Sequence, residues 1–224
     1  MKNKFKIIIL IFVLLLQFCC TKEENSVPSD GKPYYKFTQD ERNKLISQLN
    51  VNNEIIYKNQ DNTLLKFKIY SSKIEKKSET SNGFLGYSST YFHYDEQKVM
   101  MFIEGTSLNS EINILKYPVG SNYGTQFPIV GTTKFYGYFT FPLWNGYYEN
   151  DTYNKFISID FNIPTTTMTF NGKTYNKVLV LNSDKTVILE PTNVYPLNVN
   201  MIYYDYNFGI IGFDDLNGKI WRIQ

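Results

Sequence analysis

The sequence contains very little cysteine and histidine. Among 224 residues there are two cysteines, Cys19 and Cys20, and one histidine, His93. The cysteines are adjacent and near the start, so the long polar part of the chain has no disulfide framework and no thiol nucleophile. Zinc sites usually take several His or Cys ligands, which a single histidine does not supply. The sequence therefore predicts no bound metal and no other cofactor.

The sequence also lacks an excess of one charge. Its formal net charge is +2, from 23 basic and 21 acidic residues. Three of the basic residues, Lys2, Lys4 and Lys6, precede position 20, so basic and acidic residues nearly balance in the rest of the chain. A balanced chain does not present the basic surface that follows nucleic-acid phosphates, and we expect no nucleic-acid partner.

Residues 7–16 form an unbroken apolar run directly after those lysines. The run is shorter than the roughly 20 residues that a helix needs to span a bilayer. A positive segment followed by a short apolar run is typical of a secretory signal peptide. We expect residues 1–19 to be removed, which makes Cys20 the new N-terminus. Cleavage before Cys19 is the alternative.

The residues around Cys20 resemble sequences found in bacterial lipoproteins. Gln17-Phe18-Cys19-Cys20 resembles a lipobox, in which the last cysteine receives a lipid. The five residues CTKEE that begin at Cys20 resemble the Cys-x-Lys-acidic-acidic tag of Bacteroidota lipoproteins. The resemblance implies that a lipid on Cys20 anchors the protein in the outer membrane, where it faces the cell exterior. A plain signal peptide followed by a solvated charged linker is the alternative.

The rest of the chain resembles uncharacterised Bacteroidota lipoproteins over most of residues 54–224. The segments that carry the resemblance include YFHYDEQKVMMFI and MIYYDYNFGIIGFDDLNGKIWRI. This resemblance implies a single β domain and carries no known activity.

Turn residues and alternating apolar residues predict the organisation of the mature chain. Residues 20–36 are polar and contain Pro and Gly, which indicates an anchor followed by a flexible linker. Thr38 and Glu41 have the spacing of a capping box, which predicts a helix over 38–49. Residues 37–224 are then expected to form one all-β domain, an antiparallel β-sandwich or an open β-barrel of roughly a dozen strands.

Several strands and turns can be predicted individually. Asp95-Glu96 is expected to turn a hairpin between two of the strands. Asn171-Gly172 is the strongest hairpin signal and places Met168 opposite Tyr175. The predicted strands are 55–58, 63–76, 87–94, 97–104, 110–117, 132–141, 155–163, 178–181 and 185–190, followed by three short strands in the last 24 residues.

A group of aromatic residues is the candidate ligand-binding site. Tyr136 and Tyr138 alternate with phenylalanines in one predicted strand, and Trp144, Tyr147 and Tyr148 lie in the loop that follows. Exposed aromatic rings can stack on sugars or contact a partner protein. Cross-strand packing that only stabilises the sheet is the alternative interpretation.

No catalytic group can be assigned from the sequence. His93 has Asp95 nearby, but no motif supplies a nucleophile, and a structural histidine is the favoured interpretation. Asp215, Asn217 and Gly218 match part of a calcium loop, but the Glu and the further ligands of such a loop are missing, and a turn is the favoured interpretation. The candidate acidic residues for a glycosidase pair are Glu104, Asp160, Asp205, Asp214 and Asp215, and no spacing selects two of them.

Three functions remain open. We expect a non-enzymatic lipoprotein at the cell surface that binds a glycan, a peptide or a partner protein. An envelope carrier or assembly factor that holds an apolar ligand inside an open barrel is the second. A glycoside hydrolase that uses two carboxylates is the third.

Overall fold

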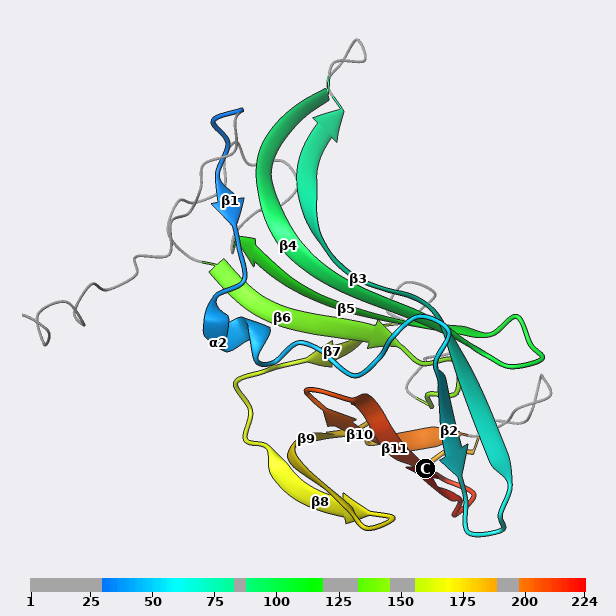
Figure 1. Cartoon of the computed structure of the whole chain (residues 1–224). Helices are drawn as coiled ribbons and strands as arrows, with labels where there is room; N and C mark the ends of the chain where they lie inside the picture. Colours follow the sequence, from blue (N-terminus) through cyan, green and yellow to red (C-terminus); the bar gives the residue numbers. More distant parts are fainter. Residues whose placement is uncertain (1–29, 83–87, 119–132, 146–155, 189–197) are drawn as a thin grey trace, which may run out of the picture.

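The computed structural model describes residues 30–82, 88–118, 133–145, 156–188 and 198–224, and Figure 1 shows their arrangement. These residues form twelve strands and one short helix. The elements are β1 (Tyr34–Tyr35), α2 (Gln39–Arg42), β2 (Glu54–Lys58), β3 (Leu64–Asn82), β4 (Ser88–Ile103), β5 (Asn109–Pro118), β6 (Thr133–Thr140), β7 (Ile157–Ile159), β8 (Thr166–Phe170), β9 (Lys173–Asn182), β10 (Val199–Asp205), β11 (Gly209–Asp215) and β12 (Ile220–Ile223).

The strands form one curled sheet, an open half-barrel, which confirms the predicted all-β fold (Figure 1). The strand order is β7-β6-β5-β4-β3-β2-β12-β11-β10-β9-β8, and all neighbours along this path are antiparallel. β1 lies outside this path and pairs with β4 in parallel. β3 is the longest strand. Its first residues pair with β2 and the rest pair with β4, so β3 joins the two halves of the sheet.

The two halves of the sheet approach each other at one end of the curl. Trp144, which follows β6, forms an isolated parallel bridge with Val199 at the start of β10. The amide of Val199 donates to the carbonyl of Leu143 at 2.8 Å, and the amide of Asn145 donates to the carbonyl of Val199 at 2.6 Å. These backbone bonds connect strands that are distant in the sheet order.

Aromatic and aliphatic side chains from both halves fill the interior of the curl. Phe67 stacks on Phe141 with ring centroids 5.8 Å apart, and Phe139 stacks on Tyr204 at 6.1 Å. These four side chains are at most 1% exposed. Burial of apolar area at about 25 cal/mol per Å² makes this interior the main source of stability.

The segment before β2 covers the interior and belongs to the folded domain. Phe37, Leu45, Ile46 and Leu49 are buried in the main core. Phe37 packs edge-on against Phe135 of β6, with centroids 5.7 Å apart. The domain therefore begins earlier than predicted, because residues 34–35 of the expected linker already form β1.

The predicted helix over 38–49 is confirmed only in its first turn. The capping box is present, since the amide of Glu41 donates to Thr38 Oγ1 at 3.2 Å and the amide of Thr38 donates to Glu41 Oε2 at 2.7 Å. α2 nevertheless ends at Arg42. The Gln97 side chain accepts from the amide of Ile46 at 2.9 Å and donates to its carbonyl at 2.6 Å. These bonds replace those that a longer helix would make.

The predicted hairpin at Asp95-Glu96 is wrong, because β4 runs through both residues without a turn. Asp and Glu are mostly exposed in folded proteins, as they would be in a turn. Asp95 is instead 4% exposed, and its carboxylate accepts from the hydroxyl of Tyr34 at 2.6 Å and from the amide of Phe37 at 2.9 Å. The N-terminal segment thus provides partners that a local sequence pattern does not show.

Other strand limits differ from the prediction. The strand expected over 155–163 is reduced to β7, and Ile163 is exposed because Asp160 starts a turn there. Residues 185–188 are not a strand, and the other part of that prediction lies outside the described residues. The hairpin at Asn171-Gly172 is confirmed. Both of these residues have a positive φ, and Met168 pairs with Tyr175.

Candidate functional site

The face of β4, β5 and β6 that points away from the interior carries a group of tyrosines and charged side chains. Glu96 lies opposite Leu115, which lies opposite Tyr136, and paired residues project their side chains to the same face. Tyr94 and Tyr138 lie two positions along from Glu96 and Tyr136 on this face. Their neighbours in the sequence, such as Phe139, are buried in the interior. Tyr136 and Tyr138 therefore lie opposite the phenylalanines, as predicted.

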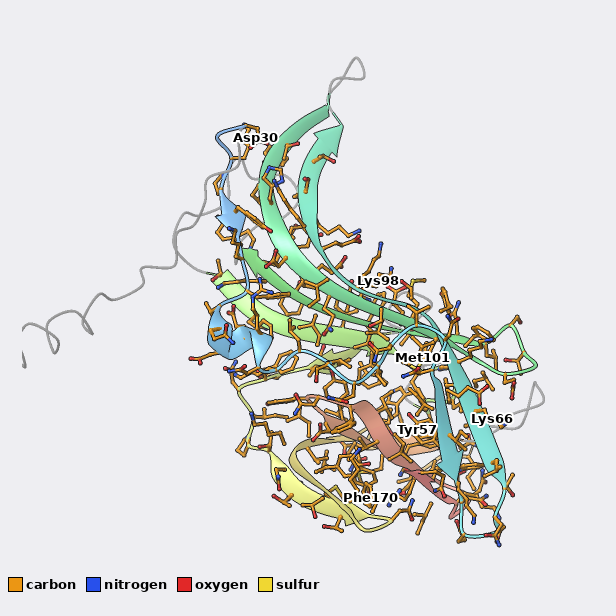
Figure 2. All side chains as sticks on the ribbon, in the orientation of Figure 1. Asp30, Tyr57, Lys66, Lys98, Met101 and Phe170 are labelled. Carbon is orange, nitrogen blue, oxygen red and sulfur yellow. The ribbon has the colours of Figure 1, made fainter. Side chains whose placement is uncertain are left out.

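Charged residues of β3 and β4 complete this group. We call it the outer-face cluster: Glu75, Lys77, Tyr94, Glu96, Lys98, Tyr136 and Tyr138. Figure 2 shows Lys98 projecting from the side of β4 opposite to that of Met101, whose side chain points into the interior. The outer-face cluster therefore consists of side chains from the middle of β3 and β4 and from β6.

Glu96 is the central residue of the outer-face cluster. It is 9% exposed, and burial raises the pKa of its carboxyl group, although Lys77 and Lys98 act to lower it. The nearest ion-pair partner is Lys77, whose Nζ is 3.8 Å from Glu96 Oε2, which is too long for a hydrogen bond. The described residues donate no hydrogen bond to this carboxylate. Glu96 is thus a nearly buried acceptor without a donor among them.

The residue that lies opposite Glu96 in the sheet makes the ionised Glu96 carboxylate more destabilising. Glu75 pairs directly with Glu96 in the β3–β4 ladder, and like charges at opposed positions destabilise a sheet. Glu75 has its own partners, Lys73 at 2.8 Å and Lys77, whose hydrogen bonds lower the pKa of Glu75 to about 2. Lys98 is likewise paired with Glu111 at 2.9 Å. Glu96 is the one carboxylate of this group that lacks a close cation of its own.

The tyrosine hydroxyls of the cluster are also without hydrogen-bond partners among the described residues. Burial, followed by the charges of Glu96 and Glu111, raises the pKa of Tyr138 to about 12. Burial and Glu96 also raise the pKa of Tyr136. These hydroxyls stay protonated at neutral pH and can donate a hydrogen bond to a ligand.

The remaining residues of the predicted aromatic site lie elsewhere or outside the described part of the chain. Trp144 packs against the main core, on the face opposite to that of Tyr138. Tyr147 and Tyr148 lie outside the described residues. The structure brings Tyr136 and Tyr138 together, and it adds Tyr94 and Glu96. A strand period of two could have placed Tyr94 and Glu96 on one face, but the predicted turn at Asp95-Glu96 obscured it.

His93 lies between two residues that the sequence did not associate with it. Its Nδ1 is 2.7 Å from Ser78 Oγ, and its Nε2 is 2.8 Å from Asp30 Oδ2. The histidine is 6% exposed, and its amide donates to the carbonyl of Pro33 at 2.8 Å. Asp95, the expected partner, bonds to the N-terminal segment instead. These hydrogen bonds lie where the N-terminal segment joins β4. We interpret them as structural contacts that hold the segment against β4.

The candidate carboxylates have separate structural partners. Asp205 and Asp215 accept backbone amides of turns, from Asn207 at 2.9 Å and from Lys219 at 2.9 Å respectively. Asp214 accepts from Arg222 Nη1 at 2.6 Å and from the Tyr203 hydroxyl at 2.7 Å.

The other two candidates are exposed. Asp160 accepts the amide of Asn162 at 2.9 Å, and Glu104 lies 3.6 Å from Lys66. The described residues thus assign each of the five carboxylates a partner of its own. No group of three or more possible metal ligands occurs within the described ranges.

Comparisons with known proteins identify no relative, since no family model, no curated protein and no solved structure matches the chain. Among the described residues, no helix is both long and apolar enough to cross a membrane.

Proposed function

We propose that this protein is a lipoprotein anchored in the outer membrane through Cys20, and that its β domain binds a ligand at the cell surface without catalysing a reaction. The anchor is supported by the signal-like first 19 residues and the CTKEE tag. The binding role is supported by one structural observation. Among the described residues, the largely buried Glu96 carboxylate accepts no hydrogen bond, and it lies beside three tyrosine hydroxyls that likewise have no partner there. These groups can exchange hydrogen bonds with a ligand in place of water.

The position of Asp30 limits how far the domain can extend from the membrane. Asp30 contacts His93 on the outlying part of β4, so only residues 20–29 connect the anchor to the fold. Ten residues span at most about 35 Å when fully extended. The β3–β4 hairpin next to Asp30, visible at the top of Figure 2, is therefore the part of the domain held near the membrane.

The anchor is tested by substitution of each cysteine in turn. Cys20→Ser is expected to abolish incorporation of an alkyne-labelled fatty acid and to release the protein from the membrane fraction. Cys19→Ser is the matched control and should leave both unchanged. Retention of the label in Cys20→Ser, with loss in Cys19→Ser, would show that Cys19 is the anchor and would reject the role of Cys20.

Exposure at the cell surface is tested separately. A protease added to intact cells should degrade the protein, while a periplasmic control protein stays intact. Complete protection of the protein on intact cells, with digestion after lysis, would reject the surface location.

Two or three acyl chains on Cys20 would anchor the protein firmly in the membrane, because each buried CH₂ contributes about 0.8 kcal/mol.

A further inference from the structure

We propose that the outer-face cluster is a binding site for a neutral carbohydrate. The proposal rests on the proposed function, since it names the ligand class of the same binding domain. It is carried by the geometry of three side-chain types: aromatic rings, a carboxylate without a donor, and lysines that are already paired.

The tyrosines supply flat surfaces and hydroxyl donors. Tyr94 packs edge-on against Tyr117 at 5.2 Å, and Tyr138 packs edge-on against Phe156 at 4.9 Å. Edge-on packing holds each tyrosine ring in a fixed orientation. Phe156 is 56% exposed and extends this aromatic surface toward β7. The apolar C–H face of a sugar ring is a suitable partner for such surfaces.

The charges of the cluster favour a ligand that is itself uncharged. Within the outer-face cluster, Lys77 and Lys98 balance Glu75 and Glu96. Their further partners, Lys73 and Glu111, preserve that balance. A cationic ligand would approach Glu96 beside two ammonium groups, and an anionic ligand would approach carboxylates. A neutral polyhydroxyl compound meets no like charge at either position.

The hydroxyl groups of a sugar also match the hydrogen-bond donors and acceptors that the cluster offers. Glu96 can accept hydrogen bonds from a ligand, because its only ion-pair contact among the described residues is Lys77 at 3.8 Å. Tyr136 and Tyr138 offer phenolic donors and need acceptors. A sugar hydroxyl is both a donor and an acceptor, so adjacent hydroxyls of one ring can satisfy a carboxylate and a phenol together. Bonds to the ionised carboxylate would be the stronger ones.

The test uses the full acylated chain purified in detergent. It is applied to an array of neutral oligosaccharides built from glucose, galactose, mannose or xylose, and the best binder is then titrated by calorimetry. At least one neutral oligosaccharide is expected to bind. Tyr136→Ala and Tyr138→Ala should each weaken that binding by about tenfold or more, as expected for a central aromatic contact.

Conservative variants and controls separate binding from folding. Tyr138→Phe keeps the ring and should weaken binding by about two- to tenfold through loss of one hydrogen bond. Tyr70→Ala is the matched control, because Tyr70 is an exposed tyrosine of β3 that contacts Phe102 outside the cluster, and it should leave affinity unchanged. Circular dichroism should be the same for all variants compared.

Three results would overturn the carbohydrate proposal. They are an array without any neutral binder, binding that does not change in Tyr136→Ala and Tyr138→Ala, and binding of tetramethylammonium in place of sugars. The third would leave the binding role of the cluster in place with another ligand class. Loss of acylation or surface exposure in the cysteine and protease experiments would instead reject the anchored function, whatever the array shows.

Discussion

Oδ2 of Asp30 lies 2.8 Å from Nε2 of His93, across 63 positions of the sequence, and so joins the N-terminal segment to β4. The His93 side chain lowers the pKa of the Asp30 carboxyl group through this hydrogen bond. Ser78 on β3 contacts the other ring nitrogen at 2.7 Å. Ser, His and Asp, the residue types of the catalytic triad of serine hydrolases, thus meet where the N-terminal segment joins β3 and β4.

The first prediction concerns this junction. His93→Ala should speed amide hydrogen exchange in residues 31–37, because the segment loses both its bond to Asp30 and the packing of Tyr34 on the imidazole. Ser78→Ala should have a smaller effect, since Ser78 belongs to β3 and not to the segment. The result is read by exchange mass spectrometry. Labelling of Ser78 by a fluorophosphonate probe would contradict a purely structural role and indicate a nucleophile.

The second prediction concerns Asp95, a buried residue of β4 that accepts hydrogen bonds from the same N-terminal segment. Asp95→Ala removes the acceptor for the Tyr34 hydroxyl and the Phe37 amide, and the partner of Arg42 at 3.3 Å. We expect a loss of about 2–4 kcal/mol in the free energy of unfolding, because buried donors are left unpaired. Urea denaturation measures it. A loss below 0.5 kcal/mol would mean that the segment does not depend on this carboxylate.

The third prediction concerns how much the buried, ionised carboxylate of Glu96 destabilises the fold. Burial raises the pKa of this carboxyl group, so the folded state holds its proton more tightly than the unfolded state does. The ionised form therefore reduces stability as pH rises through the window between the unfolded and the folded pKa. Glu96→Gln should raise the Tm at pH 7, and the difference should shrink toward acid pH.

A matched substitution controls for loss of one negative charge. Glu104→Gln removes an exposed carboxylate that lies 3.6 Å from Lys66, and the Tm should change little. Calorimetry across pH 4 to pH 8 compares the two variants. A lower Tm for Glu96→Gln at pH 7 would show that Lys77 and Lys98 already compensate the buried charge.

The fourth prediction contrasts two buried tyrosines. The hydroxyl of Tyr57 donates to the carbonyl of Ile210 at 2.7 Å, whereas the buried hydroxyl of Tyr204 has no partner among the described residues. Tyr57→Phe should cost about 1 kcal/mol, and Tyr204→Phe should be neutral or stabilising, because it removes an unsatisfied polar group. Chemical denaturation of both variants is the measurement, and equal losses would contradict the contrast.

The fifth prediction concerns Gly212. A Cβ at this position would lie 2.7 Å from the carbonyl oxygen of Trp221 and 3.0 Å from Cδ of Arg222. Gly212→Ala should cost about 1–3 kcal/mol through overpacking against backbone. Gly137→Ala should cost less, because a Cβ there would lie 3.1 Å from the flexible end of Ile159 and 3.2 Å from the carbonyl oxygen of Asn113, farther than the 2.7 Å contact at Gly212. Thermal unfolding ranks the two, and the reverse order would contradict the steric argument.

Much of the fold was predictable because the signals are local. Alternating residues identified β5 and β6, and Asn171-Gly172 identified the β8–β9 hairpin with its register. The start of α2 followed from Thr38 and Glu41. The candidate site was predictable only in part. Tyr136 and Tyr138 were identified, while Glu96 was assigned to a turn.

By itself, the sequence determined the all-β class, the helix start and the hairpin register. These depend on backbone sterics and on the period of two, which act over a few residues. Only the tertiary structure decided that Glu75 opposes Glu96, that Asp30 and Ser78 flank His93, and that Gln97 bonds to the backbone of Ile46 beyond the end of α2. Each of these pairings joins segments that are at least 15 positions apart. Their formation depends on how the sheet curls and where the N-terminal segment docks, and no local pattern encodes either.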